Sequence, residues 1–184
     1  MHADSFISQL NKHFPIQQPD AARLFEGIRS ESGCEKLDFF VHVEWPDLTL
    51  EMLEGAAEEF WQMSSVWNRY FLPAFMHLTS KCDLEFDTYH LETGTFIEVK
   101  EEYSPLILCV SSYWFSIEWF MTERFDITKN LYYGLTTEQI NLLEIWLKRT
   151  DYETLQKAGE LDGTFDYSDD GINKFIEKAH QFAA

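Results

Sequence analysis

Val66-Trp67-Asn68-Arg69-Tyr70-Phe71-Leu72-Pro73-Ala74-Phe75-Met76 is the stretch that decides the fold, because large apolar and aromatic side chains surround a single proline there. Proline fixes φ, lacks a backbone N–H and disfavours helical geometry in the residue before it. The stretch therefore predicts a buried hinge, with one helix ending at Leu72 and the next beginning at Pro73. Nothing in it is chemically reactive, so we expect it to build structure.

Length and composition predict one folded unit. The chain has 184 residues, of which 45% are hydrophobic and 16% aromatic. A chain of this size buries roughly 70% of its unfolded surface around a single core. We therefore expect residues 1–184 to form a single, mainly α domain of helical bundle-like fold with a small β-hairpin or short strands, and an α+β fold as the alternative.

The charge balance is strongly acidic. Acidic residues outnumber Lys and Arg by 32 to 14, which gives a formal net charge of −18. Nucleic acids and anionic membranes are bound chiefly through Lys and Arg, so neither is expected as a partner. A basic protein would be attracted, although the same charge also serves solubility.

Helical periodicity appears in several segments. Asp4 and Pro15 bound a first predicted helix, and a second begins near Pro19. Asp47 or Thr49 caps a third, which runs on to Trp61. Thr136 and Gln139 have the spacing of a capping box, with Leu135 and Ile140 placed as a hydrophobic staple. A final helix has its apolar positions on one side, at Ile172, Phe175, Ile176, Ala179 and Phe182.

Other segments favour extended structure or leave the choice open. Residues 39–45 are rich in β-branched and aromatic residues and predict a short strand that ends at Pro46, or an extended segment packed on helices. Residues 83–89 and 96–99 predict a hairpin that turns at residues 93–95. The apolar run from Leu106 to Met121 fits a buried helix or a buried strand.

Two motifs give the chain a resemblance. Phe71-Leu72-Pro73-Ala74-Phe75-Met76 and Leu135-Thr136-Thr137-Glu138-Gln139 resemble the aromatic-Leu-Pro-Ala-aromatic-Met motif and the Leu-Thr-x-x-Gln helix start of a group of small bacterial proteins of unknown function. This resemblance implies a mainly helical domain and supplies no catalytic residues. Small acidic bacterial proteins of this kind also look like immunity proteins, which neutralise a toxin by plugging its active site.

One segment has the spacing of a calcium loop. EF-hand loops place oxygen ligands at positions 1, 3, 5 and 12 and glycine at position 6. Asp166, Ser168, Asp170 and Glu177 match the ligand positions, and Gly171 matches the glycine. Asn173 stands where an aliphatic residue is usual, and Gly159 and Gly163 interrupt the entering helix. A polar turn in which Asp169 or Asp170 caps the last helix explains the same residues.

Motifs of known enzyme classes are missing from the sequence. The six histidines are scattered singly, and neither a zinc-binding HExxH pair, a GxSxG elbow nor a phosphate-binding glycine loop occurs. Cys34, Cys82 and Cys109 form no CxxC pair or disulfide framework, which favours a reducing cytosol. The amino terminus has no signal-peptide pattern, so we expect a cytoplasmic protein.

These observations favour a non-enzymatic, acidic binding protein of the bacterial cytoplasm, most concretely an immunity protein that neutralises a basic toxin. Its expected contact surfaces are the acidic stretches 44–59, 83–102 and 151–170, with Glu98, Glu101, Glu102, Asp151 and Glu153 as candidate partner-binding residues. No cofactor is expected unless calcium binds. The alternatives are a hydrolase-like enzyme whose site assembles only in three dimensions, with His77 or His90 beside a carboxylate, and a calcium-binding domain.

Overall fold

The computed structural model describes residues 3–26, 34–54, 56, 60–81, 86–91, 94–99, 104–122, 126–150 and 166–184. Helices dominate these residues, which confirms the expected mainly α fold. The α-helices are α1 (Ala3–His13), α2 (Leu50–Leu53), α3 (Ser65–Lys81), α4 (Ser104–Thr122), α5 (Thr137–Leu147) and α7 (Asp169–Gln181). Short 3₁₀ helices are η1 (Ala21–Arg23), η2 (Cys34–His42), η3 (Trp45–Asp47), η4 (Phe60–Gln62) and η6 (Ile127–Lys129), and the strands are β1 (Phe86–Leu91) and β2 (Gly94–Val99).

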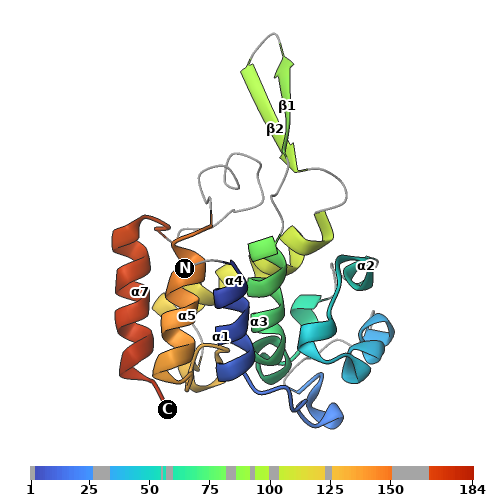
Figure 1. Ribbon diagram of the computed structural model, residues 1–184, viewed down its shortest axis with the longest axis vertical. Coiled ribbons are helices and arrows are strands. Elements are labelled where there is room, and N and C mark those ends of the chain that lie inside the picture. Colours follow the sequence, from blue (N-terminus) through green and yellow to red (C-terminus); the bar gives the residue numbers. More distant parts are fainter. Residues whose placement is uncertain are drawn as a thin grey trace.

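Four helices of the described part form a row, and a fifth packs against two of them. Helices α7, α5, α1 and α3 lie side by side, each in contact with the next, and α4 packs against both α3 and α7 (Figure 1). The elements η2, η3 and α2 lie on the far side of α3 from α7. The two strands extend away from the helices and pair antiparallel, from Phe86 opposite Val99 to Leu91 opposite Gly94. This pairing confirms the predicted hairpin, but Gly94 and Thr95 belong to β2 and not to the turn predicted at residues 93–95.

Helix α3 passes through Pro73 without interruption, so the predicted hinge is wrong. A proline inside a helix costs about 3 kcal/mol because it removes a hydrogen bond and clashes with the preceding turn. Every residue from Tyr70 to Met76 is buried, and burying one large apolar side chain contributes about 1.5 to 3 kcal/mol. Burial along the whole stretch therefore outweighs the local cost of the proline.

An aromatic cluster connects α3 to the short helical turns beside it. The ring of Phe60 makes edge-to-face contacts with Phe40, Phe71 and Phe75 at centroid separations of 5.5, 5.9 and 5.0 Å. Such pairs contribute about 0.5 to 1.5 kcal/mol beyond the area they bury. Trp67, Trp114 and Leu143 are also buried. Trp119 on α4, by contrast, is 44% exposed.

The last helices follow the sequence closely. Thr136 caps α5 in a complete capping box, because its side chain accepts the Gln139 N–H and the Gln139 side chain accepts the Thr136 N–H. Helix α7 buries its predicted apolar positions, with Phe182 half-buried just beyond its end. The apolar run from Leu106 to Met121 is helical and lies within α4.

Three local predictions are wrong. Residues 39–42 belong to the 3₁₀ helix η2 and Trp45 begins η3, so the predicted strand is absent. Phe40 packs against Phe71 of α3, and the Trp45 N–H bonds Tyr70 of the same helix. The helix expected from Pro19 is reduced, within the described residues, to η1, which Asp20 caps. Thr49 caps α2 as expected, yet α2 ends at Leu53 because Glu54 turns to an extended conformation, next to the poor helix former Gly55.

Candidate functional site

The feature with the clearest binding chemistry is an acidic segment, which we define as residues 38–54. Its acidic residues Asp38, Glu44, Asp47, Glu51 and Glu54 are all exposed. No Lys or Arg occurs between Lys36 and Arg69, whereas seven acidic residues do. Two large apolar residues of the segment, Phe39 and Met52, are 40% and 36% exposed.

Short helical turns hold these carboxylates at the surface. Apolar side chains of the same turns are buried in the core, and this burial holds each turn against the rest of the protein. The buried residues are Leu37, Phe40, Trp45, Leu48 and Leu53. Turns this short have little intrinsic stability, so their positions depend on these buried residues. Acidic residues fall between the buried ones, and this alternation places them outward.

A hydroxyl of α3 fixes the middle of the segment. Tyr70 Oη accepts the Trp45 N–H at 3.1 Å and donates to the Ile16 carbonyl at 3.0 Å. Gln18 Nε2 donates to the Val43 carbonyl at 2.8 Å, on the other side of Glu44. Burial raises the pKa of Tyr70, and the neighbouring carboxylates of Glu44 and Asp47 raise it further. The phenol of Tyr70 therefore stays neutral, so its hydroxyl proton remains available for the hydrogen bond to the Ile16 carbonyl.

The acidic segment has no cationic partners in the described part of the chain. None of its carboxylates takes part in an ion pair there. Four acidic residues elsewhere on the described surface pair with a nearby base: Glu26 with Arg23, Asp126 with Lys129, Glu144 with Lys148 and Asp170 with Lys174. Other exposed carboxylates have no ion pair there either, namely Asp20, Glu138, Asp166, Asp169 and Glu177. What distinguishes the acidic segment is that five such carboxylates fall in one stretch without Lys or Arg.

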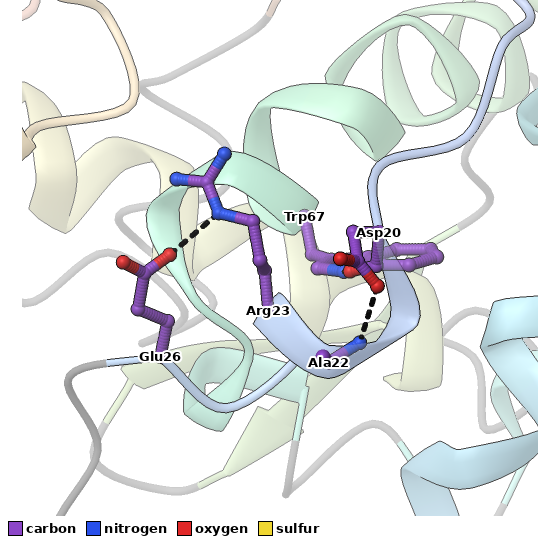
Figure 2. Close-up of polar contacts among 5 residues, drawn as sticks. All are labelled: Asp20, Ala22, Arg23, Glu26 and Trp67. Atoms are coloured by element: carbon purple, nitrogen blue, oxygen red, sulfur yellow. Dashed lines mark hydrogen bonds and ion pairs between the residues drawn. The ribbon is translucent and has the colours of Figure 1, made fainter.

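Figure 2 shows two acidic residues outside the acidic segment, Asp20 and Glu26, with their hydrogen-bonded partners. Arg23 Nε donates to Glu26 Oε2 at 2.7 Å, which neutralises Glu26 locally. Asp20 Oδ1 accepts the Ala22 N–H at 3.0 Å and so caps η1. The indole N–H of Trp67 donates to the Asp20 carbonyl at 3.2 Å. These carboxylates have local structural partners, unlike those of the acidic segment.

Of the partner-binding residues predicted from sequence, the structure describes the backbone of one. Glu98 lies in β2, opposite Asp87 of β1. Glu101, Glu102, Asp151 and Glu153 lie outside the described residues. Sequence reasoning included residues 44–59 among the acidic stretches but missed Asp38, Phe39 and the exposure of Met52. The uninterrupted absence of Lys and Arg from residue 37 to residue 68 was the signal that defines the segment.

The structure gives four of the five residues of the calcium-loop motif a local role, the exception being Glu177. Asp166 Oδ1 accepts the Ser168 N–H at 3.0 Å, and hydrogen bonds from the Ser168 side chain and backbone lower the pKa of Asp166. Ser168 caps α7 by accepting the Gly171 N–H at 3.3 Å, so the cap is Ser168 and not Asp169 or Asp170. Asp170 pairs with Lys174 at 2.5 Å.

Helix α7 also accounts for the glycine and separates the predicted ligands. A Cβ at Gly171 would collide with the carbonyl oxygen of Asp166, so close packing requires glycine there. Asp170 and Glu177 both lie within α7, separated by seven residues, or about 10.5 Å of helix rise. The predicted oxygen ligands are therefore not gathered around one point in this conformation, and calcium binding stays a prediction.

The histidines considered for catalysis lie on different elements. His77 belongs to α3, and its carbonyl accepts a hydrogen bond from Ser80 at 2.8 Å. His90 belongs to β1, opposite Thr95. Within the residues described, no three His, Cys, Asp or Glu side chains gather so as to hold a metal ion.

None of the described helices is both long enough and apolar enough to cross a membrane. Comparisons of the chain with protein-family models, with curated proteins and with solved structures give no match. The resemblance to small bacterial proteins of unknown function therefore rests on the two sequence motifs alone.

Proposed function

We propose that this chain is a binding protein that engages a basic protein through the acidic segment, most concretely a bacterial toxin that it neutralises in the cytoplasm. The observation that carries the proposal is that five exposed carboxylates without an ion pair in the described part fall in one stretch that contains no Lys or Arg. Lys and Arg side chains of a partner would supply the missing positive charge.

The exposed apolar residues support the same function. Phe39 and Met52 lie among the carboxylates, so a partner would bury apolar surface at the points where it also finds negative charge. Interfaces gain most of their affinity from a few such buried residues, whereas surrounding charges raise the association rate and select the partner. Binding by this mechanism needs no chemical step.

Charge-matched variants test the proposal. The first variant, Glu44→Gln/Asp47→Asn/Glu51→Gln/Glu54→Gln, neutralises four carboxylates of the acidic segment. The control variant, Glu26→Gln/Asp126→Asn/Glu144→Gln/Asp170→Asn, removes the same net charge at paired positions. Each protein is immobilised and exposed at low and high salt to extract of the source bacterium. The captured protein is then identified and its association rate is measured.

We expect a basic protein to bind the wild type and the control, with an association rate that falls as salt rises. The first variant should lose at least tenfold in association rate. When the captured protein is produced alone in bacteria it should arrest growth, and coexpression of the wild type should restore growth. Capture of no protein, or an equal loss in both variants, would count against the proposal.

A further inference from the structure

Ser64 and Asn68 form a buried polar pair at the start of α3. They are 4% and 8% exposed. Ser64 donates its N–H to the Leu24 carbonyl at 2.7 Å, and its own carbonyl accepts the Asn68 N–H at 2.9 Å. Asn68 Nδ2 donates to the carbonyls of Met63 at 2.7 Å and Ser64 at 3.3 Å, and the Asn68 carbonyl accepts the Tyr113 hydroxyl at 2.9 Å.

Two polar atoms of this pair have no hydrogen-bond partner within the described structure. They are Ser64 Oγ and Asn68 Oδ1, and both are buried. Rotating the Asn68 amide by half a turn does not help, because Oδ1 would then face the two carbonyls that Nδ2 now contacts. The observed orientation therefore leaves an acceptor that needs a donor. A buried acceptor without one costs about 1 to 3 kcal/mol.

A hydrogen bond places the Asn68 side chain next to Ser64. Asn68 Nδ2 lies 3.3 Å from the carbonyl oxygen of Ser64, the residue directly before α3. Ser64 Oγ can donate and accept, whereas Asn68 Oδ1 can only accept. The two atoms do not bond each other directly. A molecule that accepts from one and donates to the other satisfies both.

We propose that one internal water molecule binds between Ser64 and Asn68. It accepts the hydroxyl proton of Ser64 and donates a proton to Asn68 Oδ1. Folded proteins hold about one buried water per 27 residues, at otherwise unsatisfied polar atoms of this kind. The water completes the polar start of α3 directly before the apolar stretch around Pro73. This site is separate from the acidic segment, so the inference is independent of the proposed binding function.

Nuclear magnetic resonance of the full, ¹⁵N-labelled chain tests the site. We expect a cross-peak between the Asn68 side-chain amide protons and water, with the sign given by a long-lived bound molecule. Ser64→Ala removes one of the two polar groups that hold the water, so the same spectrum is recorded for this variant. Ser80→Ala, which removes a hydroxyl further along α3, is the control.

The bound water predicts a cross-peak in the wild type and in the control that is lost or weakened in Ser64→Ala, because the water then keeps one of its two polar partners. Absence of the cross-peak from the wild type, or equal intensity in all three proteins, would overturn the inference. A high-resolution crystal structure of the wild type distinguishes the water from a Ser64 hydroxyl that bonds Asn68 directly. Density for a water within hydrogen-bond distance of both atoms supports the site, and its absence at well-ordered side chains refutes it.

Discussion

Replacement of Gln139 by alanine should destabilise the protein more than loss of an ordinary helix cap. Gln139 Oε1 accepts the Thr136 N–H at 2.9 Å, and Nε2 donates to the carbonyl of His13 at 2.9 Å. One side chain therefore caps α5 and holds the end of α1. Each hydrogen bond contributes about 1 kcal/mol, and alanine returns roughly 0.3 kcal/mol through its better helix propensity. We expect a net loss of roughly 1.5 to 2 kcal/mol.

Urea unfolding monitored by tryptophan fluorescence measures this loss. Thr136→Ala is the matched variant, because it removes only the bond from the Gln139 N–H to Thr136 Oγ1 and should cost about 1 kcal/mol. In thermal unfolding, Gln139→Ala should lower the midpoint by roughly 3 to 8 °C. A loss for Gln139→Ala no larger than that for Thr136→Ala would refute the added role of His13.

Gln139→Glu separates the cap from the contact with α1. Glutamate serves a capping box as well as glutamine and gains from the positive end of the helix. It has no N–H for the His13 carbonyl, however, and at neutral pH places a carboxylate oxygen there. We therefore expect Gln139→Glu to be about 1 kcal/mol less stable than wild type. Equal or greater stability would show that the contact with α1 contributes nothing.

Three further predictions follow from the core, the last helix and the buried ionisable groups. Leu143→Ala should cost about 3 kcal/mol in urea unfolding, because a fully buried side chain leaves a cavity; a near-neutral result would mean that the core is misplaced. Ser168→Ala should cost about 1 kcal/mol as a lost helix cap, and calorimetric titration with calcium should give equal heats for wild type and Glu177→Gln if the motif is only structural. Burial raises the pKa of Tyr113 and of the Cys109 thiol above their ordinary values of 10.0 and 9.0, so the folded state favours the neutral forms. The stability that these neutral forms contribute is present below about pH 9 and is lost as pH rises above it. In urea unfolding from pH 8 to 11, Tyr113→Phe should therefore make the free energy of unfolding fall less steeply with pH.

Patterns that depend on local geometry predicted the fold well. The capping box at Thr136 and the apolar side of α7 require only the spacing of nearby residues, and both are confirmed. The prediction of a hinge at Pro73 was wrong because it considered only the local effect of proline, which is smaller than the effect of tertiary packing. Helix α3 lies at the centre of the packing, and the burial of its aromatic residues exceeds the cost of one proline.

The candidate site was less accessible to sequence reasoning. The charge of residues 44–59 was visible, and the ion pairs of the described part all join residues three or four apart, so the lack of nearby Lys and Arg could be read from the sequence. The exposure of Phe39 and Met52 could not, because it depends on how the turns pack on the core. The composition around Phe39 predicted a strand. In the structure the neighbouring Phe40 packs against Phe60 and Phe71, and both Phe39 and Phe40 lie in a 3₁₀ helix. No periodicity predicts such a turn, because its position is set by the buried residue and not by backbone regularity.

The separate anchoring of each acidic turn has a consequence for how binding specificity can change. Each turn is held by its own buried residues, so no continuous helix links the carboxylates between them. These buried residues are Leu37 and Phe40 in the first turn, Trp45 and Leu48 in the second, and Leu53 in the third. Substituting one exposed acid should leave the positions of the others intact. Such a surface can acquire a new charge pattern one residue at a time, and can follow a changing partner while the interior stays the same.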